Sequence, residues 1–179
     1  GSAPDELVPS QRAIAERMAA VWQAGWEAAG APPVLAPAGD DPAAQRGIAA
    51  SASVLTGSAL LVLHATDFPQ GEAEFDQLQR LWEREGLLVS ASRLLVADRP
   101  DGSDKTGDRR LDRLVERAAG PLVLSSEVRR PPGERTILTF DVVRPSTDEQ
   151  LAIWQQALGD TRGLEADDLR ALVFQFDLD

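Results

Sequence analysis

Ala59-Leu60-Leu61-Val62-Leu63 is an unbroken apolar run of strand length, and Gly57 separates it from the segment before it. A continuous apolar run, unlike an alternating one, is typical of a strand in a parallel sheet that is covered on both faces. Similar short runs lie at 34–35, 94–97 and 122–124, and residues 136–143 form a fifth candidate strand. The sequence therefore predicts five strands in a buried, mostly parallel sheet.

Amphipathic segments lie between and around these runs. In the first of them an apolar residue recurs at helical spacing, which places one face against a core: Ile14, Met18, Val21 and Trp22. The predicted helices cover residues 10–29, 42–55, 71–88, 111–119, 146–158 and 164–176, with a polar loop at 98–107. Strands that alternate with helices predict an open α/β sheet with right-handed crossovers, followed by a helical pair.

Sequence signals at two helix starts support this order. Asp41 before Pro42 combines an N-cap carboxylate with a proline whose missing N–H would be unpaired anyway. Ser146 and Glu149 form an S-x-x-E capping box. In the helix at 71–88, the side expected to face the core carries Phe75, Leu78, Leu81 and Trp82.

Composition excludes several classes of function. The 179 residues contain no cysteine and only one histidine, His64, which excludes disulfides, thiolate catalysis and two-histidine metal sites. The net charge of −11 argues against a nucleic-acid partner, because such binding depends on neutralising phosphates. No apolar run approaches 18 residues and no apolar leader opens the chain, so we expect a soluble, cytoplasmic protein without a membrane partner.

In open α/β sheets, ligands bind beyond the carboxyl ends of the strands. The reactive or special residues at those predicted ends are Gly39, Asp40, Asp41, His64, Asp67, Asp98, Arg99, Ser125, Ser126 and Arg144. Residues 36–43, APAGDDPA, lie between a strand and a helix, where a phosphate loop G-x-x-x-x-G-K-[ST] would belong.

Compared position by position, that stretch departs from the phosphate loop where the chemistry lies. Ala36 and Asp41 stand at the two glycine positions. Pro42 stands at the lysine, and Ala43 at the metal-binding hydroxyl. A phosphate needs free N–H groups and positive charge at the helix N-terminus. We therefore expect a helix start capped by Asp41 rather than a phosphate site.

Two other interpretations remain open. A phosphoacceptor receiver domain has an acidic pair, an aspartate, a hydroxyl and a Lys-Pro at its strand ends, and the loose counterparts here are Asp40-Asp41, Asp98, Ser125 and Arg144-Pro145. The ten-residue link 126–135 is short for the crossover helix that such a domain needs. His64 directly follows a strand, where an acid–base role is possible, although no serine elbow accompanies it.

Basic residues concentrate in the second half of the chain. Eight of the 18 are Lys105, Arg109, Arg110, Arg113, Arg117, Arg129, Arg130 and Arg135. Six acids are interleaved with them: Asp104, Asp108, Asp112, Glu116, Glu127 and Glu134. This alternation predicts a solvated, salt-bridged face rather than a nucleic-acid patch, with a subunit interface as the next interpretation.

Three local segments resemble an AAA+ ATPase domain of a large bacterial AAA-family protein. They are Leu81-Trp82-Glu83-Arg84-Glu85, Pro145-Ser146-Thr147-Asp148-Glu149-Gln150 leading to Trp154, and Leu172-Val173-Phe174-Gln175-Phe176-Asp177. The resemblance covers about residues 33–179. It implies an N-terminal helix and linker over 1–31, an α/β P-loop-like core over 32–145, and the start of a truncated helical lid over 146–179.

The resemblance also implies site residues. Residues 36–43 stand at the Walker A position and 94–98 at the Walker B strand, where Asp98 matches the metal-linked aspartate and Arg99 replaces the water-activating glutamate. Ser125 or Ser126 stands at the sensor-one position, and Arg129 and Arg130 stand where an arginine finger would reach a neighbouring subunit. The third lid helix, with its sensor-two arginine, is expected to lie beyond this chain.

These inferences predict a degenerate AAA+-like domain that does not hydrolyse ATP, has no catalytic residue and no cofactor, and serves as a structural or interaction module of a larger ATP hydrolase. The expected partners are other proteins or other domains of the parent chain, including ring-type self-association. One alternative is an active or nucleotide-sensing ATPase domain that binds Mg·ATP at an atypical loop formed by Gly39, Asp40, Asp41, Asp98 and Ser125. The second alternative is the receiver-like phosphoacceptor.

Overall fold

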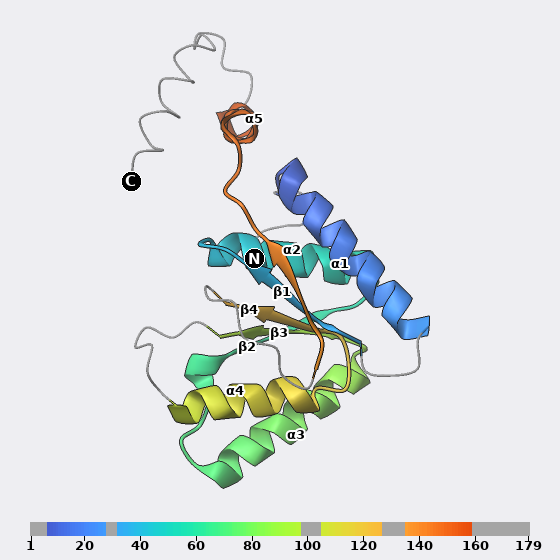
Figure 1. The fold of residues 1–179 in the computed structure, drawn as a ribbon, viewed down its shortest axis with the longest axis vertical. Coiled ribbons are helices and arrows are strands. Elements are labelled where there is room, and N and C mark those ends of the chain that lie inside the picture. Colours follow the sequence, from blue (N-terminus) through green and yellow to red (C-terminus); the bar gives the residue numbers. More distant parts are fainter. Residues whose placement is uncertain (1–6, 28–31, 98–104, 127–134, 159–179) are drawn as a thin grey trace.

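The computed structural model describes residues 7–27, 32–97, 105–126 and 135–158. They form a five-stranded, all-parallel sheet with helices on both faces, as Figure 1 shows. The predicted α/β class is confirmed. In chain order the elements are α1 (Pro9–Glu27), β1 (Val34–Ala38), α2 (Pro42–Leu55), β2 (Leu60–His64), the short helix η2 (Ala65–Asp67), α3 (Glu72–Leu88), β3 (Ser92–Val96), α4 (Lys105–Arg117), β4 (Leu122–Ser125), β5 (Ile137–Asp141) and α5 (Thr147–Leu158).

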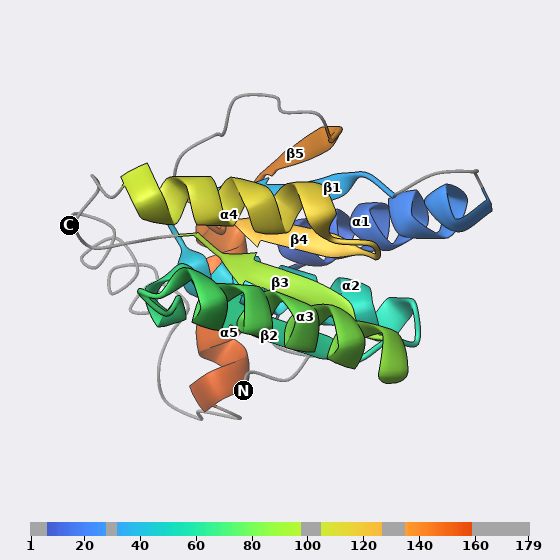
Figure 2. The ribbon, with the colours of Figure 1, turned by 90° about the horizontal axis from the view of Figure 1, so that it is seen from below.

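The strand order across the sheet is β2-β3-β4-β1-β5. After β1 the chain crosses to the far edge at β2, returns stepwise through β3 to β4, and then passes β1 to reach β5. Because right-handed crossovers in opposite directions put their helices on opposite faces, α2 lies on one face and α3 and α4 on the other. Figure 2 shows α3 and α4 side by side over the sheet.

Two apolar cores hold the layers together. The first lies between α1, α2 and the sheet and includes Met18, Trp22 and Ile48, all fully buried. The second lies under α3 and α4 and includes Phe75, Leu111 and Leu114. Each such side chain contributes about 1.5–3 kcal/mol of burial free energy. The predicted apolar face of the first helix is confirmed, with Val21 only partly buried at its margin.

The strand that signals the fold is less buried than its composition predicts. β2 is an edge strand paired only with β3 among the described strands, and its central Val62 is 45% exposed. Cover on both faces was therefore a wrong expectation for this strand, because continuous apolar character does not tell an edge from a centre. In α3, Leu81 is likewise 40% exposed, whereas Phe75 and Trp82 are buried.

Among the element boundaries that differ from the sequence prediction, those of β1, β3 and α4 are the most informative. β1 continues through Pro37 to Ala38, because the whole strand pairs in register with β5. A proline cannot donate to the ladder, which made this stretch read as a loop. β3 begins two residues early and includes the buried Arg93, and α4 begins at Lys105, inside the predicted loop.

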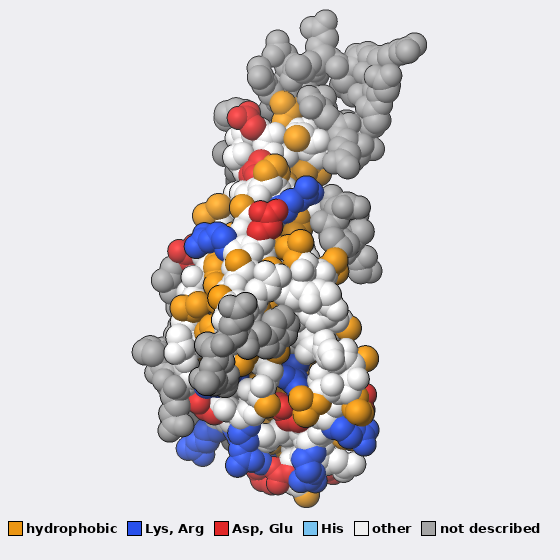
Figure 3. Space-filling model, turned by 90° about the vertical axis from the view of Figure 1, so that its right-hand side faces the viewer, with side chains coloured by type: hydrophobic (Ala, Val, Ile, Leu, Met, Phe, Trp, Pro, Cys, Tyr) orange, Lys and Arg blue, Asp and Glu red, His pale blue; other side chains and the backbone are white. Residues whose placement is uncertain are grey.

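Two arginines of α4 join this helix to α3 and to the segment that precedes α3. Arg110 is buried and donates to the carbonyls of Pro69 and Gln70 and to the Glu72 carboxylate. Arg113 pairs with Glu72 and Asp76 of α3. Ion pairs are therefore present on this face, but these carboxylates belong to α3 and not to the interleaved acids of the predicted cluster, and Arg110 is buried where a solvated side chain was predicted. Figure 3 shows basic and acidic side chains interleaved on the lower part of the molecule, where α3 and α4 lie in Figure 1.

Arg135 closes the carboxyl end of α4. Its guanidinium donates to the carbonyls of Val115 and Ala118 at 2.9 and 2.8 Å, and to the Pro32 carbonyl. These carbonyls have no helical partner, and a cation there is favoured by the helix dipole. Burial lowers the pKa of Arg135 from its usual value. This arginine of the predicted basic cluster therefore has a structural role.

The C-terminal segment, which the resemblance predicts to begin a helical lid, is described only in part. The Ser146–Glu149 capping box at the start of α5 is confirmed: the Ser146 N–H donates to the Glu149 carboxylate at 3.0 Å, and the Glu149 N–H donates to Ser146 Oγ at 3.3 Å. The predicted helix over 164–176 lies outside the described residues. Among the helices described, none is long and apolar enough to span a membrane.

Candidate functional site

The turn between β1 and α2 lies at the carboxyl end of the sheet, and Asp41 caps the helix that follows. Asp41 Oδ1 accepts from the backbone N–H groups of Ala43 at 2.9 Å and Ala44 at 3.0 Å. Pro42 at the first helical position brings no N–H of its own. The predicted capped start is confirmed, and the donors that an anion would need are already in use.

Gly39 is required by close packing between β1 and the end of β5. A Cβ at this position would lie 2.4 Å from the Val142 carbonyl oxygen. The Val142 N–H donates to the Ala38 carbonyl at 2.8 Å, which draws the two backbones together. The glycine that suggested a phosphate loop thus has a packing explanation within the fold.

A buried amide connects this turn to β4. Gln45 on α2 donates through Nε2 to the Gly39 carbonyl at 2.8 Å and accepts from Ser125 Oγ. Both Gln45 and Ser125 are fully buried. The hydroxyl expected to face a ligand is therefore directed into the protein, where it fixes the position of the turn against the sheet.

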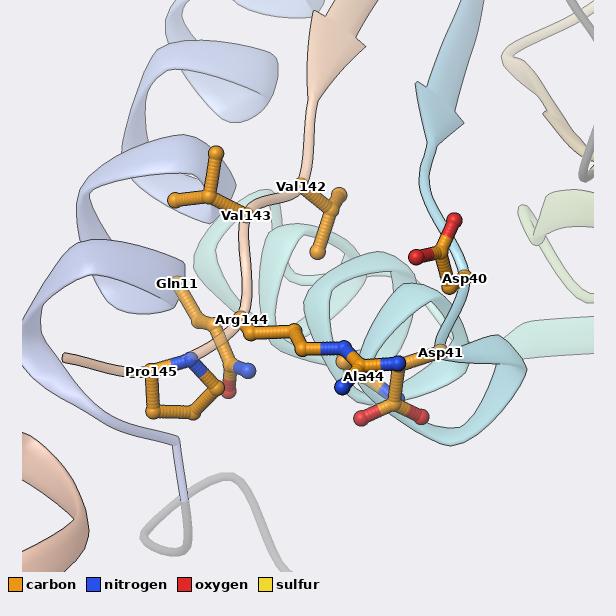
Figure 4. Close-up of a pocket in the computed structure, with 8 residues that line it drawn as sticks. All are labelled: Gln11, Asp40, Asp41, Ala44, Val142, Val143, Arg144 and Pro145. Carbon is orange, nitrogen blue, oxygen red and sulfur yellow. The ribbon is translucent and has the colours of Figure 1, made fainter. Parts of the chain in front are cut away.

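A pocket of about 240 Å³ opens beside the turn. Its lining comes from the start of α1, the β1–α2 turn and the segment after β5: Gln11, Asp40, Asp41, Ala44, Val142, Val143, Arg144 and Pro145. Figure 4 shows the Gln11 amide directed into this space and the Arg144 side chain extended across it toward Asp41. The pocket thus combines carboxylates, one guanidinium, one amide and apolar walls.

Glu149 holds two walls of the pocket together. Its carboxylate accepts from the Ser10 N–H at 2.8 Å and from Ser10 Oγ at 3.1 Å, in addition to its capping bond with Ser146. These bonds, first that from the Ser10 backbone and then that from Ser146, lower the pKa of Glu149. The first turn of α1, which carries Gln11, is thereby joined to the segment that carries Pro145.

The β1–α2 turn offers unfavourable chemistry to a nucleoside triphosphate. The two N–H groups nearest the helix start bond to Asp41, and the exposed carboxylate of Asp40 lies beside them. Two carboxylates repel a polyphosphate, and no lysine stands at the position that would offset them. At about 240 Å³ the pocket is also smaller than the roughly 300–1,000 Å³ typical of small-molecule sites.

The structure brings only some predicted site residues together. Gly39, Asp40 and Asp41 share one turn, and Ser125 reaches it through Gln45. His64 and Asp67 lie at the β2 edge, separated from β1 by β3 and β4. Asp98, Arg129 and Arg130 lie outside the described residues.

The strand order bears on the receiver alternative. In flavodoxin-like folds, to which receiver domains belong, the order is 2-1-3-4-5, so that β1 lies between β2 and β3. Here β1 lies between β4 and β5. The acidic pair after β1 is consequently separated from the end of β3 by β4, and this sheet does not assemble a receiver site.

Two glutamines of the site were missed from the sequence. Gln11 precedes Ile14, Ala15 and Met18 on the buried face of α1, and Gln45 lies among buried residues of α2. A polar residue in phase with an apolar helix face is the signal that could have found them.

Within the ranges that the structure describes, no three acidic or imidazole side chains come together in a way that could hold a metal ion. No protein-family model matches the chain, and a search of the curated proteins finds no match.

Proposed function

We propose that this chain is a degenerate AAA+-like domain that neither binds nor hydrolyses ATP and acts as an interaction module of a larger ATPase. The cytoplasmic location, the protein partners and the ring-type assembly of the parent belong to the same proposal. Its support is a five-stranded parallel sheet with helices on both faces, together with the local resemblances in the sequence.

The observation that carries the proposal is the occupied start of α2. Where a phosphate would sit, Asp41 accepts the Ala43 and Ala44 N–H groups. An internal carboxylate is always present at its binding site, whereas a phosphate would have to displace it and tolerate its charge. The arrangement therefore stabilises the helix and opposes nucleotide binding.

Calorimetric titration with Mg·ATP and Mg·ADP tests this proposal. We expect no heat of binding up to millimolar nucleotide and no change in the melting temperature. A nucleotide present at 100 times its dissociation constant would stabilise the fold by about 2.7 kcal/mol, which such a melt detects easily. Binding at micromolar affinity, or turnover above the buffer rate, would overturn the proposal in favour of the ATPase alternative.

A variant with a restored phosphate loop tests whether nucleotide binding is absent because the loop residues are replaced or because the turn has a different backbone shape. The variant Ala36→Gly, Asp41→Gly, Pro42→Lys, Ala43→Thr recreates the spacing G-x-x-x-x-G-K-T. We expect it to gain nucleotide binding, and the matched control that keeps Pro42 but carries the other three changes to gain none. A correctly folded restored variant that binds no nucleotide would count against the AAA+-like part of the proposal.

A further inference from the structure

We infer that the pocket between α1, the β1–α2 turn and residues 142–145 binds the guanidinium group of an arginine side chain from a partner protein. This inference rests on the proposed function, because it names the partner chemistry of the interaction module. It concerns the side of the turn away from β4, and of its polar side chains only Asp41 has another role assigned above, as the N-cap of α2.

Gln11 is the observation that points to a ligand. Its side chain is only 7% exposed, and its amide has no hydrogen-bond partner among the residues described. An amide that reaches a pocket without a partner inside the protein is available to hydrogen-bond a ligand there. Figure 4 shows this amide directed into the pocket, where its oxygen and its nitrogen can meet a ligand.

The charges around the pocket favour a cation. Asp41 uses Oδ1 for both capping bonds, which leaves Oδ2 for another donor. Asp40 and Arg144 line the same pocket, and neither has an ion-pair partner within the described part of the chain. Two carboxylates against one guanidinium make the site net negative, on a chain whose net charge is −11.

The shape and polarity select a guanidinium over an ammonium. The apolar walls are Ala44, Val142, Val143 and Pro145. A guanidinium is planar and weakly hydrated, so it can enter between apolar walls and still direct several N–H groups at different acceptors. The three available acceptors, the Gln11 amide oxygen and the Asp40 and Asp41 carboxylates, lie on different sides of the pocket. An ammonium would lose more hydration for fewer matched contacts.

Titration with blocked arginine, which carries an acetyl group and an amide at its ends, tests the inference. Two-dimensional ¹H–¹⁵N spectra of the full chain would follow the Gln11 side-chain amide and the Ala43 and Ala44 backbone signals. We expect saturable shifts of these signals with a dissociation constant of about 1 mM or lower, which corresponds to about −4 kcal/mol. Blocked citrulline, which has the same shape without the charge, should bind at least about fivefold more weakly.

Single substitutions should change this affinity in opposite directions. Asp40→Asn should weaken binding about two- to fivefold, and Arg144→Gln, which removes a competing cation, should strengthen it by a similar factor. Gln11→Leu should weaken it about fivefold. Asp67→Asn makes the same charge change at the opposite edge of the sheet and should leave the affinity unchanged.

Four results of these titrations would contradict the inference. Equal affinity for blocked lysine would remove the guanidinium preference, and tighter binding of free arginine than of blocked arginine would point to a small metabolite instead of a protein partner. An equal loss with Asp67→Asn would show non-specific attraction, and the absence of shifts up to 20 times the expected constant, about 20 mM, would refute the site. The Mg·ATP titration tests the proposed function separately. Absence of both arginine binding and nucleotide binding would refute the arginine site and leave the proposed function standing, whereas nucleotide binding would refute the proposed function.

Discussion

Gly39→Ala tests the closest approach in the candidate site. The added methyl carbon would lie 2.4 Å from the Val142 carbonyl oxygen and 3.2 Å from Val142 Cβ. Restoring ordinary contact requires β1 and β5 to separate by about 1 Å at this point, which also stretches the 2.8 Å bond from the Val142 N–H to the Ala38 carbonyl. The carbonyl oxygen belongs to the backbone and the Cβ is bonded directly to it, so neither can rotate away.

The expected loss of stability combines two effects. Overpacking against backbone costs about 1–3 kcal/mol, and a weakened backbone hydrogen bond adds about 1 kcal/mol. The total of about 2–4 kcal/mol should lower the melting temperature by about 4–16 °C, at 2–4 °C per kcal/mol for a chain of this size. Urea unfolding followed by circular dichroism measures the free energy, and a thermal scan measures the shift.

Gly47→Ala is the matched control, because the same methyl group is added in the interior of α2. Its nearest neighbour there is Leu7 Cδ2 at 3.0 Å, the end of a side chain that can rotate. Helix propensity favours alanine over glycine by about 0.5–1 kcal/mol, so this variant should be as stable as the parent or slightly more stable. If Gly39→Ala also unfolds within about 0.5 kcal/mol of the parent, the close contact between Gly39 and Val142 is refuted.

Three further substitutions test the hydrogen bonds around the site. Asp41→Ala should cost about 1 kcal/mol in urea unfolding through loss of the N-cap of α2, and an unchanged stability would show that the cap is not formed. Glu149→Gln should cost at most about 1 kcal/mol at pH 7, because the residue is only partly buried and its charge is screened by solvent. Since its folded pKa is lowered from 4.5, the stabilisation by Glu149 is present above pH 4.5 and disappears as the pH falls through the lowered value. The difference between parent and variant in urea unfolding should therefore shrink as the pH is lowered below 4.5, and a difference that stays constant would contradict the assigned bonds. Arg135→Met should cost about 2–3 kcal/mol by leaving the last carbonyls of α4 unpaired, which thermal unfolding would show, whereas a purely solvated arginine would cost almost nothing.

Much of the architecture follows from local sequence signals. Asp41-Pro42 marks the start of α2 because capping chemistry depends only on neighbouring residues. The apolar phase of Met18 and Trp22 identifies the buried face of α1 for a similar reason. The strand count and the parallel class follow from the alternation of apolar runs with helical segments.

The composition of a strand does not reveal its neighbours. Leu60–His64 is as apolar as a central strand, yet it lies at an edge, whereas Val34–Ala38 contains a proline and lies between two strands. Strand order depends on which crossovers pack against which face, and those contacts join residues far apart in the chain. For the same reason the sequence could not show that Gly39 faces Val142 or that Ser125 bonds to Gln45.

For the candidate site, too, some features follow from the sequence and others only from the fold. Residues 36–43 exclude an ordinary phosphate loop from their order alone, because the lysine and the second glycine are replaced. The pocket that joins Gln11 to Asp40 and Arg144 depends on three segments that only the fold brings together. Local interactions act between neighbours in the chain and can be read from their order, whereas a pocket is the space left between distant segments and depends on how all of them pack.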